Sequence, residues 1–207
     1  MTIQDTDLLL VVDVQNDFCP GGALAVEDGA GVVPVINNLM PNFSHIVLTQ
    51  DWHPANHSSF ASNHESQSPF GTIDMPYGPQ TLWPDHCVQG SDGAGFHPDL
   101  ITDPASLIIR KGMNPAIDSY SAFFENDQRT STGLTGYLKE KNITRVFFTG
   151  LAYDFCVLYS AQDAVRQQLE TIVVTDACRA IDMDGSAQAA TDAMTANGVT
   201  LLTSAQL

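Results

Sequence analysis

Six short apolar runs that do not alternate with polar residues constrain the fold of this sequence more than any other feature. A strand with one face in water alternates apolar and polar side chains, whereas a strand covered on both faces is apolar throughout. The runs therefore predict a mostly parallel, six-stranded sheet that is buried on both faces. They are Leu8–Val14, His45–Thr49, Ser106–Ile109, Arg145–Thr149, Thr171–Thr175 and Val199–Leu202.

Helical patterns of apolar residues lie between several of these runs. The last of them ends before Asn197-Gly198, which is typical of a helix terminus. Strands that alternate with helices predict an α/β fold, here a doubly wound three-layer α/β/α sandwich with right-handed crossovers. The predicted helices are Gly31–Met40, Thr132–Lys141, Cys156–Leu169 and Ser186–Ala196.

No linker divides the 207 residues, so we expect a single domain over 1–207. One connection, residues 52–104, is much longer than the loops of a compact domain usually are. It is rich in Pro, Gly, Ser and Asn, and it contains both tryptophans and most of the histidines. We therefore interpret it as a functional loop rather than a disordered one.

Charge and sorting signals exclude several classes of protein. The formal net charge is −16, with 24 acidic and 8 basic residues, which argues against binding to nucleic acid or to an anionic membrane. No signal peptide begins the sequence, and no apolar run approaches the roughly 20 residues that span a bilayer. The four cysteines form no Cys-x-x-Cys pair, which argues against a structural zinc site. Without a secretory signal, we expect them to be reduced thiols in a cytoplasmic protein.

Chemically versatile side chains follow four of the predicted strands. Asp13 ends the first run, Asp51 and His53 follow the second, Lys111 follows the third, and Cys156 follows the fourth. Ligands of open parallel sheets bind beyond the carboxyl ends of the strands. We therefore expect these side chains to converge on one site at that edge of the sheet.

Cys156 is the candidate nucleophile of this site. At the start of a helix its thiolate would be stabilised by the helix dipole, and the N–H groups of Ala152 and Cys156 would form an oxyanion hole. Asp13 is the candidate base and Lys111 its cationic partner. The alternative interpretation is a structural ion pair between Asp13 and Lys111, with Cys156 as a small core residue.

A second cluster has the composition of a metal site. Asp51 and His53 alternate on an extended segment and therefore point the same way, and His86 in the long loop is a third candidate ligand. This set suits Zn, Fe or Mn as a divalent ion, with His57 as a further possibility. The alternative is surface histidines with Asp51 capping a turn.

The motifs together resemble the isochorismatase-like cysteine hydrolases, and among them the nicotinamidases and pyrazinamidases. The resemblance covers nearly the whole chain in order. Its segments are LVVDVQNDFCPGGAL at 10–24, TQDWHPANHSSF at 49–60, WPDHCV at 83–88, KG at 111–112, DSYSAF at 118–123 and GLAYDFCV at 150–157.

The resemblance implies an amidohydrolase that converts nicotinamide to nicotinate and ammonia in NAD salvage, and that also accepts pyrazinamide. Carried over by position, Cys156 forms a thioester, Asp13 is the base and Lys111 orients this pair. Asp51, His53 and His86 hold a metal ion that faces the pyridine nitrogen, with His57, Ser58, Ser59 or water completing the shell. The Leu151–Ala152 peptide is cis in relatives. The substrate-binding residues implied are Phe18, Trp83, Tyr120, Leu151 and Phe155.

Other functions compete with this one. The chain can be a related cysteine amidohydrolase of another small amide, or a non-catalytic α/β protein that binds a metal or ligand. A dinucleotide-binding module would need a Gly-x-Gly-x-x-Gly turn after the first strand, where this chain has acidic residues. A thiol-redox protein would need a second cysteine near Cys156. A small-molecule amide is the expected partner, and a homo-oligomer is compatible with the sequence.

Overall fold

The computed structural model describes all of residues 1–207 and contains the predicted parallel sheet. Six strands lie in the order β5-β2-β1-β6-β7-β8, and every neighbouring pair is parallel. The doubly wound α/β prediction is therefore confirmed. The strands are β1 (Asp7–Val12), β2 (His45–Asp51), β5 (Leu107–Lys111), β6 (Arg145–Leu151), β7 (Glu170–Arg179) and β8 (Thr200–Leu202).

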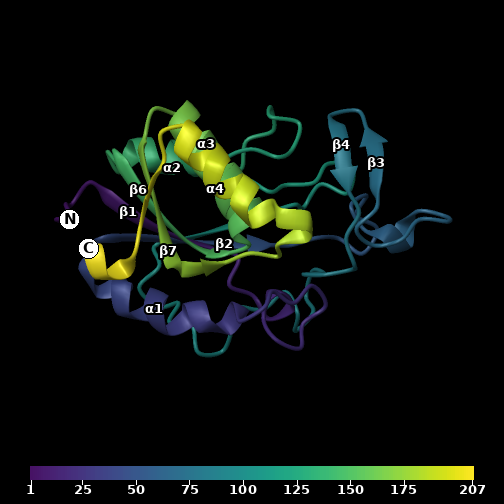
Figure 1. Ribbon diagram of the computed structural model, residues 1–207, viewed down its shortest axis with the longest axis horizontal. Coiled ribbons are helices and arrows are strands. Elements are labelled where there is room, and N and C mark those ends of the chain that lie inside the picture. The colour runs from purple at the N-terminus through teal and green to yellow at the C-terminus, as the bar shows by residue number, and fades with distance from the viewer.

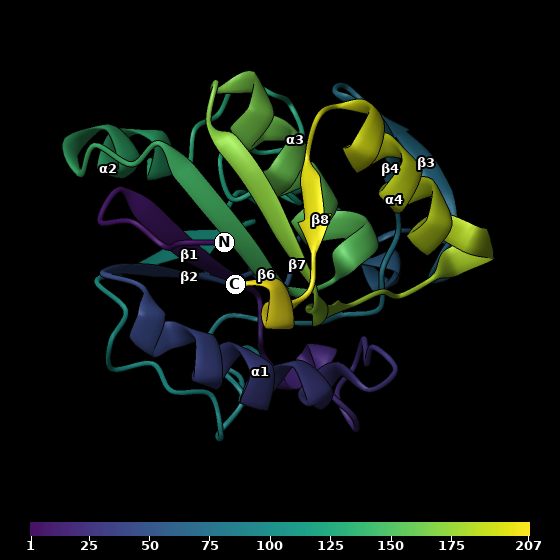
Figure 2. The ribbon, with the colours of Figure 1, turned by 60° about the vertical axis from the view of Figure 1, so that its left-hand side comes forward.

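Helices cover both faces of this sheet and form the outer layers of the sandwich. Figures 1 and 2 show α1 (Val32–Leu39) on one face, and α2 (Leu134–Glu140), α3 (Leu158–Arg166) and α4 (Ser186–Ala196) on the other. Leu9 and Val11 of β1 pack into the first apolar cluster, whereas Leu8 and Leu10 pack into the second. Because both faces are covered in this way, the strand is apolar at every one of these positions.

The boundaries of most predicted elements differ from the structure by a few residues, and two of these differences affect the site. β1 ends at Val12, and Asp13 lies beyond it with a positive φ of 46°. The helix predicted from Cys156 to Leu169 begins only at Leu158. A π turn, Tyr153–Val157, precedes it and carries Cys156, so the thiol lies in a widened turn and not in the first turn of α3.

The long loop is ordered and contains a small hairpin that the sequence analysis did not predict. Strands β3 (Thr72–Met75) and β4 (Gly78–Thr81) pair antiparallel and project from one end of the molecule (Figure 1). These four-residue strands lack a clear apolar alternation, and one contains a proline, so they carry little strand signal. Isolated bridges from His53 to Val88 and from Phe60 to Trp83 join distant parts of the loop, and a bridge from Phe96 to Gln15 joins it to the segment after β1.

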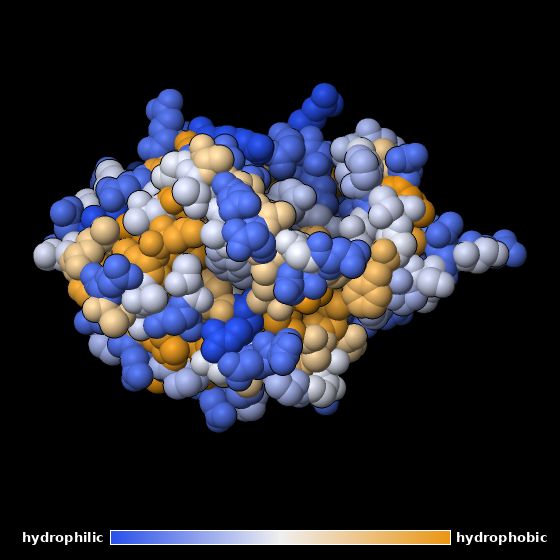
Figure 3. Space-filling view, viewed as in Figure 1, coloured by the Kyte–Doolittle hydropathy of each residue, from blue (hydrophilic) through white to orange (hydrophobic).

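Apolar residues on the surface are dispersed. On the face in Figure 3, hydrophobic residues form patches that are separated by hydrophilic ones. None of the helices combines the length and hydrophobicity that crossing a bilayer requires. All four cysteines are buried and unpaired. The exposed large hydrophobic residues come from separate segments, most of them outside helices and strands: Met1, Phe70, Ile101, Ile108, Met113 and Tyr159.

Candidate active site

The four strand ends that the sequence analysis singled out lie next to one another. The strand order β5-β2-β1-β6 places them side by side, and the register pairs Asp51 of β2 with Lys111 of β5. Val12, immediately before Asp13, pairs with Gly150 of β6. A Cβ on Gly150 would lie 2.0 Å from the carbonyl oxygen of Val12, so glycine is required where these two strands approach.

Lys111 is the centre of the site. Its Nζ lies 2.8 Å from Asp13 Oδ2 and 3.4 Å from the Sγ of Cys156, and it also donates a hydrogen bond to Asp51. A further hydrogen bond of 2.9 Å goes to the carbonyl of Ser119. Burial lowers the pKa of Lys111, but the charges of Asp13 and Asp51 raise it well above its ordinary value. The ammonium group is therefore charged and touches both predicted clusters.

Asp13 is fully buried and is held by β2 as well as by Lys111. Its Oδ1 accepts a hydrogen bond of 2.6 Å from the hydroxyl of Thr49, whose oxygen in turn accepts the backbone N–H of Asp13. Burial raises the pKa of Asp13 above its ordinary value, and Lys111 opposes this effect. A carboxylate with a raised pKa is a stronger base, which suits a group that must accept a proton.

The thiol of Cys156 is protonated in this environment. Burial raises its pKa well above the ordinary value, Lys111 lowers it, and Asp13 raises it by charge and by hydrogen bonding to the thiol. These surroundings favour the neutral thiol over the thiolate that the sequence analysis expected at a helix N-terminus, and Cys156 lies in the π turn before α3. The adjacent Leu151–Ala152 peptide is cis, and the carbonyl of Ala152 accepts the N–H groups of Phe155 and Val157.

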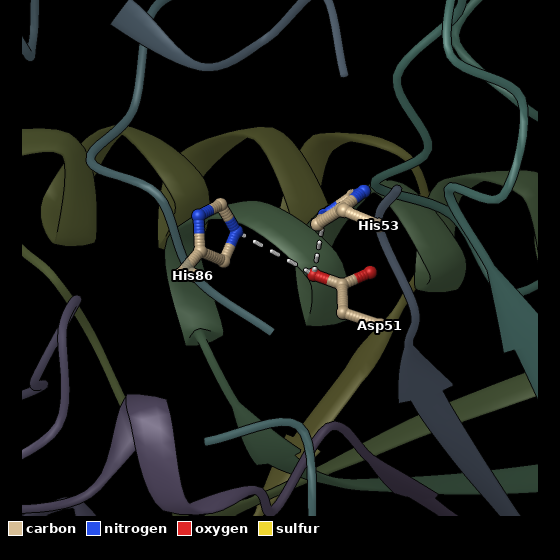
Figure 4. Close-up of side chains that lie close together, drawn as sticks. All are labelled: Asp51, His53 and His86. Atoms are coloured by element: carbon tan, nitrogen blue, oxygen red, sulfur yellow. Dashed lines mark ion pairs between the residues drawn. The ribbon is translucent and has the colours of Figure 1, made fainter. Parts of the chain in front are cut away.

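Asp51, His53 and His86 come together as the sequence predicted (Figure 4). Their ligand atoms lie within 4.8 Å of one another, and all three side chains are buried. His53 Nε2 is 3.5 Å and His86 Nε2 is 3.9 Å from Asp51 Oδ2. Two ligands that each lie about 2.1 Å from a tetrahedral zinc ion are about 3.4 Å apart, so this spacing fits a shared metal ion.

Backbone carbonyls orient both imidazoles for this role. His53 Nδ1 donates to the carbonyl of Gly112 at 2.9 Å, and His86 Nδ1 donates to the carbonyl of Pro84 at 2.8 Å. Since carbonyls only accept, each Nδ1 carries a proton, which leaves Nε2 as the ring nitrogen that can bind a metal ion. A hydrogen bond from the other ring nitrogen to a carbonyl is typical of histidines that bind metals.

The titration of these groups also suits a metal site. Burial raises the pKa of Asp51, but Lys111, His53 and His86 lower it more, so that it stays ionised. Burial lowers the pKa of His86 to about 4, which keeps its ring neutral. For His53, burial lowers the pKa and Asp51 raises it above its ordinary value. A metal ion would therefore compete with a proton for the ring of His53. The side chains available are one carboxylate and two imidazoles, a set of ligands that suits Zn, Fe or Mn.

The other candidate metal ligands, His57, Ser58 and Ser59, do not belong to the Asp51–His53–His86 cluster. His57 Nδ1 lies 2.7 Å from the hydroxyl of Ser59, and its Nε2 lies 3.3 Å from the carbonyl of Ile117. Both ring nitrogens of His57 therefore have partners within the protein. The hydroxyl of Ser58 is buried without a hydrogen-bond partner.

A narrow cavity joins the thiol to the Asp51–His86 cluster. Trp83 and Phe155 meet edge to face at 4.9 Å, Tyr120 lies 5.6 Å from Phe155, and the Trp83 N–H donates to the hydroxyl of Tyr120. Aromatic walls of this kind suit a flat ring. The cavity is lined by Phe18, Leu24, Asp51, Trp83, His86, Asp118, Tyr120, Ala152, Phe155, Cys156 and Ile181.

This lining differs from the sequence prediction in two respects. Leu151, predicted to bind substrate, is fully buried in the apolar core and does not line the cavity. Leu24, Asp118 and Ile181 line it without having been assigned a role. The motif residues 10–24 and 118–123 contained a signal for Leu24 and Asp118, whereas Ile181 follows β7 in a segment that carries no motif.

Comparison with known proteins identifies the family. Residues 7–206 match the isochorismatase domain model. The chain is 57% identical over 196 residues to the nicotinamidase of Acinetobacter baylyi, which covers 95% of this chain and 92% of that protein.

Solved structures agree with this assignment. The nicotinamidase/pyrazinamidase of Acinetobacter baumanii superimposes with a TM-score of 0.97 at 53% identity, covering 98% of each chain. The pyrazinamidase of Pyrococcus horikoshii, solved in complex with zinc, gives a TM-score of 0.77 at 33% identity, covering 96% of this chain and 99% of that one. The chain is therefore a hydrolase acting on amides, and it belongs to the isochorismatase family.

Proposed function

We propose that this protein hydrolyses nicotinamide to nicotinate and ammonia in NAD salvage, and that it also hydrolyses pyrazinamide. The observation that carries the proposal is the position of Lys111. This residue touches the Asp13–Cys156 pair and the Asp51 carboxylate of the metal cluster, beside an aromatic cavity. Such a two-part site can hold a ring at one end and an amide at the other. The 57% identity to a nicotinamidase supports the same substrate.

Asp13 and Cys156 would perform the chemistry through a thioester. Asp13 accepts the thiol proton as the sulfur attacks the carboxamide carbon, and it then donates that proton to the departing ammonia as the C–N bond breaks. A water molecule, losing its proton to Asp13, attacks the thioester carbon, and the released sulfur recovers the proton. Lys111 holds Asp13 in place and stays charged throughout. The N–H groups of Ala152 and Cys156 would stabilise the oxyanion.

The two ends of the cavity would recognise different parts of the substrate. A zinc, iron or manganese ion held by Asp51, His53 and His86 would supply a Lewis acid for the pyridine nitrogen of the substrate. Phe18, Trp83, Tyr120 and Phe155 enclose the ring and exclude water from the thiol.

Ammonia release from nicotinamide by the wild type and by Cys156→Ala tests the mechanism. We expect turnover to fall by about three orders of magnitude or more in the variant, because covalent catalysis depends on the sulfur atom. Cys19→Ala serves as a matched control, since that thiol is also buried but does not line the cavity. Undiminished turnover by Cys156→Ala would refute the thioester mechanism.

A panel of three amides tests the substrate. With the metal-loaded protein, nicotinamide and pyrazinamide are expected to react much faster than an aliphatic amide of similar size, because only the two rings offer a nitrogen to the metal. Equal rates on all three amides would contradict ring recognition and favour a general amidase.

A further inference from the structure

Asp154 is a buried carboxylate close to the nucleophile that the proposed chemistry does not use. It lies in the π turn, two residues before Cys156, and only 3% of its surface is exposed. None of the ion pairs in the protein includes it. A buried carboxylate without a cation must be compensated by hydrogen-bond donors.

All the donors to Asp154 come from one segment, residues 181–186, which connects β7 to α4. Its Oδ1 accepts the N–H of Ile181 at 3.0 Å. Its Oδ2 accepts the N–H of Asp182 at 2.8 Å and the hydroxyl of Ser186 at 2.5 Å. Asp154 therefore fastens this segment to the turn that carries Cys156.

The segment has few other restraints. Apart from Asp154, it is restrained by a short 3-10 turn, Met183–Gly185, and by the N–H of Ala187, which donates to Asp182 Oδ1 at 3.2 Å. Asp182 and Asp184 both have left-handed backbone conformations, with φ of 56° and 50°. Non-glycine residues keep such conformations only where the surroundings hold them. The hydrogen bond from the Asp182 N–H to Asp154 is one of the contacts that hold this backbone.

Ile181 connects the hydrogen bonds of Asp154, which we call the anchor, to the substrate cavity. It lines the cavity together with Phe18 and Leu24, and it packs against the apolar cluster that contains both of them. Because Ile181 belongs to no helix or strand, no ladder of main-chain bonds fixes the depth to which its side chain enters the cavity. The bond from its own N–H to Asp154 supplies that restraint.

We propose that Asp154 is a positioning residue that holds Ile181 in the wall of the cavity, and that Ile181 limits which ring substituents the cavity accepts. The inference rests on the proposed function, since it takes an aromatic amide as the occupant. Asp154 acts through Ile181 and contributes no proton to the reaction.

Three variants and one control test the proposal by kcat and KM on nicotinamide and a set of ring-methylated nicotinamides. Ile181→Ala is expected to raise kcat/KM of at least one methylated analogue, relative to nicotinamide, by about tenfold or more, as a pocket contact of methyl size does. Asp154→Asn and Ser186→Ala remove acceptor or donor atoms of the anchor. Both variants should raise kcat/KM of the same methylated analogue relative to nicotinamide, by a smaller factor than Ile181→Ala.

The control is Asp192→Asn, the same chemical change on the exposed part of α4, where the carboxylate accepts only the side chain of Gln188. It should leave every ratio unchanged. If Asp154→Asn lowers kcat equally on all substrates without changing the ratio, then Asp154 acts on the Cys156 turn and the proposal is overturned. An unchanged ratio in Ile181→Ala overturns it as well.

NMR of isoleucine δ1-methyl groups gives a readout that does not depend on turnover. The Ile181 resonance, assigned by its loss in Ile181→Val, should move in Asp154→Asn and Ser186→Ala without ligand, and stay in place in Asp192→Asn. Should the wild type fail to hydrolyse nicotinamide, the proposed function is wrong, while this measurement still decides whether Asp154 positions Ile181. A resonance that stays unmoved in both anchor variants refutes the positioning.

Discussion

The ammonium nitrogen of Lys111 lies 2.8 Å from Asp13 Oδ2, and neither side chain has any surface in contact with solvent. The same nitrogen bonds to Asp51, so one cation compensates two buried carboxylates. This arrangement couples the nucleophile's base to the metal cluster through a single side chain. Loss of Lys111 should therefore affect folding, metal binding and turnover together.

Lys111→Met should lower the free energy of unfolding by about 3–5 kcal/mol, because it leaves two buried carboxylates without their cation. Turnover should be lost in the fraction that still folds. Urea unfolding and ammonia release measure the two effects. Lys139→Met, at the exposed end of α2, makes the same change and should stay within about 0.5 kcal/mol of the wild type. A Lys111→Met protein as stable as this control would contradict the account of the site.

His86→Ala should reduce the metal content of the purified protein and weaken metal affinity by about 10-fold or more, because it removes one of three ligands. His57→Ala is the matched control. Both ring nitrogens of His57 bond within the protein, so this variant should keep its metal and lose only stability. Elemental analysis and metal titration of the apo protein distinguish the two. Equal loss of metal from both variants would place His57 in the metal shell.

Gly112→Ala should displace His53 and reduce metal content and turnover. A Cβ at this position would lie 2.3 Å from the ring of His53, and the backbone φ of 64° is unfavourable for alanine. Gly136→Ala, in α2, meets no atom within 4 Å and should raise stability by about 0.5–1 kcal/mol. Metal analysis and thermal unfolding of both variants check this. Full metal content in Gly112→Ala would show that the backbone at residue 112 can shift without displacing His53.

Glu125 should make the protein less stable as the pH rises from about 4.5 to about 7. Burial, together with the charges of Asp127 and Asp118, raises the pKa of Glu125 to about 7, and its Oε2 is buried without a partner. In this window the unfolded chain has already lost the proton that the folded protein still holds, so the free energy of unfolding falls with pH. Above a pH of about 7, Glu125 is ionised in the folded protein as well, and the full destabilisation by its buried charge is present.

Glu125→Gln removes this ionisation. It should unfold with a free energy about 1 kcal/mol higher than the wild type at pH 8, and with little difference at pH 4.5. Urea unfolding at the two pH values measures the effect. Glu140→Gln, an exposed residue of α2, should show no such dependence. A stability difference between wild type and Glu125→Gln that does not change with pH would contradict the raised pKa.

The sheet was predictable because its signal is local. Burial on both faces makes each strand apolar at successive positions, as Leu8–Val12 shows, and this can be read from neighbouring residues alone. The π turn at Tyr153–Val157 and the β3–β4 hairpin were not predicted. Their short segments have no periodicity of their own, and packing against other parts of the chain decides their conformation.

The site was predictable in its residues but not in its contacts. The position of Asp13, Asp51, Lys111 and Cys156 at strand ends implied that they converge, since parallel strands end at one edge. The bond between Lys111 and Asp51 depends on β5 lying beside β2, which the motifs did not specify. The position of Ile181 in the cavity depends on Asp154, 27 residues away.

The sequence by itself determined the class of fold, the family and the candidate residues of the site, because buried strands and the motifs at their ends consist of contiguous residues. Only the tertiary structure decided that Lys111 joins the two clusters, that Leu151 lies in the core, and that Ile181 takes a place in the cavity wall. These contacts link segments that are 27 to 98 residues apart. The strand order and the packing of the connecting segments determine these contacts. Neither can be inferred from the local periodicity of the sequence.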